Sequence, residues 1–96
     1  MSLDQIIREE ARLIILRELS EQANYSLGET LLQAVLEQFA ISRSREWIRE
    51  ELRCLAELGA VTLSQAGSVT VARLTDKGAD HVAGRLRIEG VKRRAP

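Results

Sequence analysis

The spacing of apolar residues along the chain changes at Gly59 from the period of a helix to the period of a strand. Residues 45–58 contain no helix breaker, Ser44 precedes them as an N-cap, and Gly59 follows at the C′ position. The inward face of this helix is predicted to hold Ile48, Leu52, Leu55 and Leu58, with Trp47 at its margin. Beyond Gly59, apolar and polar residues alternate on both sides of the turn sequence SQAGS, with apolar residues at Val61, Leu63, Val69 and Val71. A helix that leads directly into a hairpin with one apolar face predicts a mainly α domain with a small β-hairpin, of the α+β class.

Two helices are predicted before this segment. The first covers residues 3–22, where apolar residues recur at helical spacing among strong helix formers. A short strand at residues 25–27 follows. Ser26 and Glu29 have the spacing of a capping box, so the second helix is predicted to begin near residue 28, and it continues to residue 39.

The fourth helix is predicted to begin after the hairpin, with Thr75 or Asp76 as its N-cap. Its buried stripe is predicted to consist of Ala79, Val82, Ala83 and Leu86. His81 in this helix has no second histidine nearby and is expected at the surface or as a capping residue. Cys54 is expected to be a part-buried apolar residue. One cysteine and one histidine are too few for a disulfide or a metal site, and no cofactor is predicted.

The chain of 96 residues contains no internal repeat and no proline before Pro96. We therefore interpret it as one domain at residues 1–90 followed by a basic tail at residues 91–96. The N-terminal segment carries acidic residues from Asp4 onward, and its longest apolar run covers only residues 13–16. Neither a signal peptide nor a membrane span is predicted, and a cytoplasmic location is expected.

Charge is balanced overall, with 14 basic and 14 acidic side chains, but it is unevenly distributed. Residues 1–41 hold three bases and seven acids, a net charge of −4, whereas residues 42–96 hold eleven bases and seven acids, a net charge of +4. The molecule is therefore polarised, and its positive half begins just before the third predicted helix. Chance clustering of solvated charge is the alternative.

The first predicted helix carries apolar residues around most of its circumference. The residues beyond its main stripe are Leu13, Ile15, Leu16 and Leu19. A helix of this kind is either central to its domain or shared with a second copy. We predict that these four residues form the interface of a homodimer.

The predicted order of helix, short strand, helix, turn, helix, hairpin and helix resembles the winged helix-turn-helix domain of small bacterial transcription regulators of the ArsR and MarR types. The segment IREELRCLAELGAV is similar to a recognition helix that leads into a wing, and LTDKGADHV is similar to the segment that leaves it. Over about residues 3–90 the chain also resembles small winged-helix proteins of Mu-like prophages. The resemblance implies a winged-helix fold and a small phage- or prophage-type DNA-binding protein, in transcription control or phage DNA handling.

The outward face of the third helix holds the residues predicted to contact double-stranded DNA. Arg49 and Arg53, one turn apart, would reach guanine edges or phosphates in the major groove. Glu46 would accept a hydrogen bond from a cytosine amino group, and Arg43 and Arg45 would contact the backbone at the start of the helix. Further contacts are predicted at the base of the hairpin and in the tail, from Arg73, Lys92, Arg93 and Arg94.

The same face holds as many glutamates as arginines, so a second interpretation remains open. In this alternative Glu46 pairs with Arg49 on the helix surface, and Glu50 pairs with Arg53 in the same way. The turn SQAGS also lacks the basic tip of a typical DNA-binding wing. The second hypothesis is therefore a protein-binding winged-helix adaptor or dimerisation module without DNA contact. Enzymatic activity is not predicted, because the sequence contains no phosphate-binding loop, nucleophile elbow or paired Cys/His set.

Overall fold

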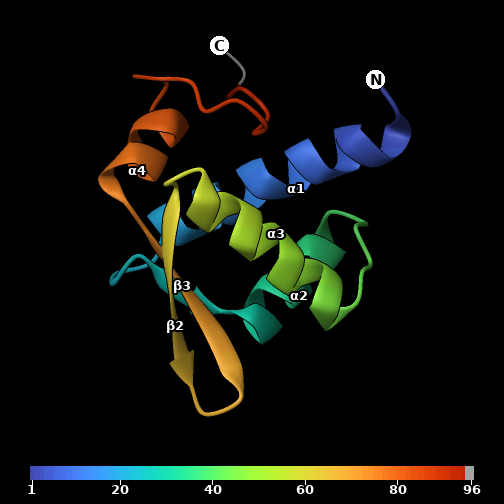
Figure 1. The fold of residues 1–96 in the computed structure, drawn as a ribbon, viewed down its shortest axis with the longest axis vertical. Helices are drawn as coiled ribbons and strands as arrows, with labels where there is room; N and C mark the ends of the chain where they lie inside the picture. The colour runs from blue at the N-terminus through green and yellow to red at the C-terminus, as the bar shows by residue number, and fades with distance from the viewer. Residues whose placement is uncertain (95–96) are drawn as a thin grey trace.

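In a computed structural model, the chain folds as helices packed on a small antiparallel sheet (Figure 1). The structure describes residues 1–94. The helices are α1 (Leu3–Ser20), α2 (Glu29–Gln38), α3 (Arg45–Glu57) and α4 (Asp76–Val82), and the strands are β1 (Ser26–Gly28), β2 (Val61–Ala66) and β3 (Val69–Leu74). The predicted α+β class and order of elements are confirmed. No helix within residues 1–94 is long and apolar enough to span a bilayer. Ala95 and Pro96, the end of the predicted tail, lie outside the described residues.

Helices α3 and α4 both begin at a side-chain N-cap that the sequence predicted. Ser44 Oγ accepts a hydrogen bond from the backbone N–H of Trp47 at 3.1 Å, and Thr75 Oγ1 accepts one from Gly78 N–H at 3.0 Å. Gly59 follows α3 with a φ of +78°, a left-handed conformation that glycine adopts without steric cost. These local signals therefore set both ends of α3 and the start of α4.

The predicted capping box at the start of α2 is wrong. Gly28 is the N-cap, and no side chain caps this helix. Strand β1 continues through Gly28, which leaves Ser26 two residues before the cap and out of reach of the helix. The Ser26 hydroxyl donates instead to the carbonyl oxygen of Asn24, and the Glu29 carboxylate binds side chains of α3.

The strands form a sheet in the order β1-β3-β2, and every pair is antiparallel. Strands β2 and β3 are longer than predicted and use most of the SQAGS segment, leaving Gly67 and Ser68 as a two-residue loop. Gly67 has a φ of +63°, as a tight hairpin requires. The hairpin extends beyond the helices at one end of the molecule (Figure 1).

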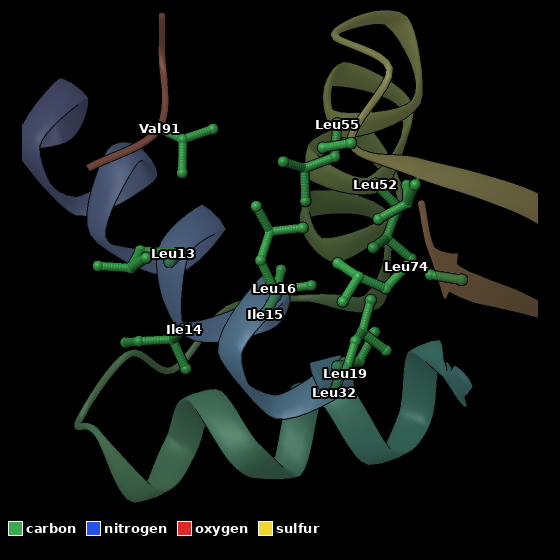
Figure 2. Close-up of a cluster of buried hydrophobic side chains, with 14 of the residues drawn as sticks. Leu13, Ile14, Ile15, Leu16, Leu19, Leu32, Leu52, Leu55, Leu74 and Val91 are labelled. Atoms are coloured by element: carbon green, nitrogen blue, oxygen red, sulfur yellow. The ribbon is translucent and has the colours of Figure 1, made fainter. Parts of the chain in front are cut away.

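Helix α1 lies at the centre of the domain, with contacts to α2, α3, α4 and β3. Figure 2 shows its side chains among Leu32 of α2, Leu52 and Leu55 of α3 and Leu74 of β3. The four residues predicted to form a dimer interface are nearly or fully buried in this core, with exposed fractions of 5% for Leu13 and 0% for Ile15, Leu16 and Leu19. That assignment is wrong, because other elements of the same chain cover all four of these side chains. The alternative of a central helix is correct.

The buried face of α4 differs from the predicted stripe. Gly78 and His81 are buried, Ala79 and Val82 are half-buried, and Ala83 and Leu86 are exposed and lie beyond the end of the helix. A Cβ at Gly78 would lie only 2.3 Å from the carbonyl oxygen of Ala60. The helix backbone therefore packs directly on the segment after α3, and this close approach turns Gly78 inward.

The C-terminal segment is part of the packed domain through Lys92. Ile88 and Val91 are buried, and the backbone N–H of Lys92 donates to the carbonyl oxygen of Glu9 on α1. His81, predicted at the surface, is only 2% exposed. Its Nδ1 accepts from Ile88 N–H at 3.0 Å, so its Nε2 donates to the Lys92 carbonyl oxygen at 2.9 Å. The predicted boundary at residue 91 is therefore too early, because His81 holds the segment against α4 and the Lys92–Glu9 bond holds it against α1.

Candidate nucleic-acid interface

A groove of about 380 Å³ separates α3 from the β2–β3 hairpin. Its lining consists of Arg49, Arg53, Leu63, Gln65, Ser68 and Thr70. Because side chains alternate along a strand, Leu63 and Gln65 share one face of the hairpin with Thr70. Gln65 Nε2 donates to Thr70 Oγ1 at 3.0 Å across the two strands. The groove thus presents two arginines and three neutral polar side chains, and no carboxylate lines it.

Arg49 is held in a fixed position at this groove. Its Nε lies 2.6 Å from Glu29 Oε2 and its Nη2 lies 2.9 Å from Glu29 Oε1, which is a bidentate pair. The same Nη2 donates to the carbonyl oxygen of Ser68 in the hairpin loop at 3.3 Å. This guanidinium therefore connects the start of α2, the middle of α3 and the tip of the hairpin.

Glu29 is fully buried and also accepts a hydrogen bond from Arg45 Nη2 at 2.7 Å. The hydrogen bonds from Arg49 and Arg45, with a further one from the backbone of Thr70, lower the pKa of Glu29 from 4.5 to about 2 and outweigh the opposing effect of burial. The same contact with Glu29 raises the pKa of Arg49. Two guanidinium groups and one carboxylate leave a single net positive charge at this site.

Arg53 differs from Arg49 because its side chain is 60% exposed. It pairs with Glu50 at 3.1 Å, as the surface-pair interpretation predicted. The companion pair between Glu46 and Arg49 is not formed, since Arg49 binds Glu29 instead. Glu46 is an exposed residue of α3. Exposed ion pairs contribute little to stability, so Arg53 can exchange its partner for another anion at small cost.

The structure places the remaining predicted DNA contacts away from this groove. Arg43 stacks over the Trp47 ring, 5.5 Å from its centroid, on the side of α1 and α2. Arg73 lies on the opposite face of the sheet from Thr70, because it is three positions further along β3 and successive side chains point to alternate faces. Of the predicted contacts, Arg49 and Arg53 line the groove, and Arg45 is connected to it through Glu29, which it shares with Arg49.

The three predicted basic residues of the tail lie near α1 and α4. Lys92 Nζ is 2.8 Å from Glu10 Oε2, an ion pair whose geometry is not that of a hydrogen bond. Arg93 and Arg94 line a separate pocket of about 790 Å³ beside α4. The tail and the α3 groove are thus different surfaces.

A second buried carboxylate, Glu51, lies on the inner face of α3. Arg8 Nη1 lies 2.5 Å from Glu51 Oε2, and Arg12 Nε lies 2.7 Å from Glu51 Oε1. Arg12 also donates to the carbonyl oxygen of Gly90 at 2.8 Å. These contacts join α3 to α1 and to the C-terminal segment, so Glu51 serves the fold and not the groove.

Sequence reasoning missed both buried glutamates and the polar lining of the hairpin. The sequence did carry a signal for Glu51, because this residue is at position i+3 from Ile48 and so falls on the apolar face of the helix. Glu29 carried no such signal, since the first turn of a helix is an ordinary place for an acid. Gln65 and Thr70 could have been found from the alternation of the hairpin. Within the described chain, no three His, Cys, Asp or Glu side chains come together to hold a metal ion.

Comparison with known proteins identifies relatives in a phage and in a bacterium. The chain is 36% identical over 94 residues to the uncharacterized protein gp26 of Escherichia phage Mu, and the match covers 98% of this chain and 97% of the phage protein. It is 34% identical over 65 residues to an uncharacterized protein of Haemophilus influenzae, covering 68% of this chain and 63% of that protein. No protein-family model matches the chain. No solved structure matches it significantly.

Proposed function

The chain belongs to the family of the phage Mu protein gp26, and we propose that it binds double-stranded DNA through the groove between α3 and the β2–β3 hairpin. In this proposal the architecture is a winged helix-turn-helix, with α3 as the recognition helix and the hairpin as the wing. The order of elements and the strand order β1-β3-β2 support that assignment. The protein would act without catalysis, in the cytoplasm, in transcription control or phage DNA handling.

The observation that carries the proposal is the chemistry of the groove lining. Two arginines one helical turn apart face neutral hydrogen-bonding groups, with no carboxylate among them. Arginine donates in a planar fork that fits both phosphate oxygens and the O6 and N7 atoms of guanine. An α-helix fits the major groove of B-form DNA, which would bring this face to the base edges.

The two arginines would have different roles. Arg53 is exposed and bound only to a surface glutamate, so it can turn toward DNA. Arg49 is held by Glu29 and Ser68, which orients its guanidinium in advance but neutralises part of its charge. Arg53 is therefore expected to contribute more to affinity than Arg49.

A binding measurement with a fluorescent random-sequence duplex tests the proposal. Arg53→Ala is expected to weaken binding about fivefold or more, because it removes a cationic contact to the phosphate backbone, which a duplex of any sequence offers. Arg17→Ala is the matched control, since it removes the same charge from an exposed residue of α1 outside the groove. Equal affinities for the two variants would contradict the assignment of the groove.

A protein-binding adaptor is the second candidate function. It is favoured by the pairing of Arg45 and Arg49 with buried Glu29, which lowers the positive charge that α3 presents. If the wild-type protein shows no binding to duplex DNA even at about 50 mM salt, where electrostatic attraction is strong, the adaptor function replaces DNA binding.

A further inference from the structure

A second groove, of about 590 Å³, lies between the first half of α1 and the segment that follows α2. Its apolar lining consists of Met1, Ile6, Ile7, Phe39, Ala40 and Ile41. None of the residues that line the α3 groove contributes to it. This apolar groove is therefore a separate surface from the proposed DNA site.

Large apolar side chains are left in water around this groove. Ile6 is 48% exposed and Phe39 is 55% exposed, although both are of the size that usually fills a core. Leu3, on the same side of α1 by helical spacing, is 71% exposed. The first two turns of α1 thus form an apolar ridge beside an apolar groove, an arrangement that marks an interaction surface.

Ala40 at the edge of the groove has an unusual backbone conformation. It follows α2 with a φ of +62°, in the left-handed region that disfavours residues with a Cβ. The corresponding positions after α3 and α4 are Gly59 and Gly84, with φ values of +78° and +79°. Ala40 therefore places a methyl group on the wall of the groove, at a position where glycine is the favoured residue.

We propose that this apolar groove binds the same surface of a second copy of the chain, forming a symmetric homodimer. A ridge next to a groove is self-complementary, because a two-fold axis places the ridge of each copy in the groove of the other. The dimer would use the exposed first turns of α1 and not the buried second half. It would leave both α3 grooves uncovered, so it does not depend on the proposed DNA binding.

The charges around the groove favour a second copy over a membrane. Glu9 and Glu10 lie on the α1 side, where Lys92 pairs with Glu10, whereas Arg43 lies on the opposite side, after α2. A two-fold contact brings the acidic α1 edge of one copy toward the partner's Arg43, and the reverse contact forms at the same time. An anionic membrane is disfavoured because Glu9 and Glu10 offset Arg43 and Lys92 around the groove, whereas membrane-binding surfaces combine apolar residues with a basic rim.

Light scattering after size exclusion tests the dimer. The wild-type protein is expected to have twice the chain mass at micromolar concentration. Ile6→Glu and Phe39→Glu should each give a monomer, because they place a charge in the apolar contact, and both sites are exposed in the single chain. The matched control is Leu31→Glu, which adds the same charge at a 58% exposed residue of α2 outside the groove and should stay dimeric.

Glu9→Lys tests the charge argument separately. It should raise the dissociation constant of the dimer about threefold or more, because it places two like charges together at the contact. Circular dichroism of each variant checks that the fold is retained. A wild-type monomer at roughly 100 µM would overturn the proposal and assign the groove to another occupant. Dimeric mass in folded Ile6→Glu or Phe39→Glu, or dissociation of Leu31→Glu, would overturn the assignment of the surface.

Discussion

Glu29 joins α2 to α3 directly and to the hairpin loop through Arg49. It begins α2, its carboxylate binds Arg45 and Arg49 of α3, and Arg49 in turn reaches the hairpin loop. A fully buried carboxylate is costly unless cations neutralise it and hydrogen bonds satisfy its oxygens. Here two guanidinium groups do both, so the geometry of the groove depends on the charge of Glu29.

The pH dependence of stability provides a test at Glu29. Its pKa is lowered from 4.5 to about 2 on folding, so its contribution to stability is present above about pH 4.5 and is lost as the pH falls toward 2. Urea unfolding followed by Trp47 fluorescence should show Glu29→Gln well below wild type in free energy of unfolding at pH 7. The gap should narrow between about pH 4.5 and pH 2. A gap that stays constant over this range would show that Glu29 is not ionised in the folded protein.

At the scale of elements, local signals in the sequence predicted most of the fold. Ser44, Gly59 and Thr75 mark helix ends through interactions within one turn, and the structure confirms them. Which element packs against an apolar surface is not determined by the local sequence, because it depends on contacts between residues far apart in the chain. The second half of α1 was therefore assigned to a second copy, although its own chain covers it.

The candidate site was only partly predictable, for the same physical reason. Helical spacing placed Arg49 and Arg53 on one outward face of α3, and both line the groove. The bond from Arg49 to Glu29 joins residues that are 20 positions apart, and it depends on how α2 packs against α3. Arg73 was misplaced because the face of a strand that meets a helix is decided by sheet register and packing.

The packing of α4 provides a test at this scale. Alanine normally stabilises a helix relative to glycine by about 1 kcal/mol. Gly78→Ala should instead destabilise the protein by about 2 kcal/mol or more, because its Cβ would meet the Ala60 oxygen at 2.3 Å and Leu74 Cδ1 at 2.7 Å. Urea unfolding at neutral pH measures the change. A more stable variant would show that α4 does not approach the Ala60 backbone so closely.

At the scale of the whole molecule, buried ion pairs join the acidic first half of the chain to the basic second half. The acidic first half supplies Glu29 to two arginines of the second half, and the second half supplies Glu51 to two arginines of the first. The halves therefore neutralise each other where they pack. The positive charge that remains available to a polyanion lies in separate clusters on the surface. The groove between α3 and the hairpin holds one of these clusters.

The salt dependence of binding to duplex DNA tests the central claim most directly. Phosphate contacts from the two arginines of the groove would give a log-log slope of about −1.8, so affinity should fall on the order of tenfold between about 50 and 200 mM salt. Arg53→Ala should flatten the slope by about 0.9 if this side chain contacts a phosphate. Anisotropy titrations at several salt concentrations measure both quantities. An absence of binding at about 50 mM salt, or an affinity that does not change with salt, would contradict DNA binding through this groove.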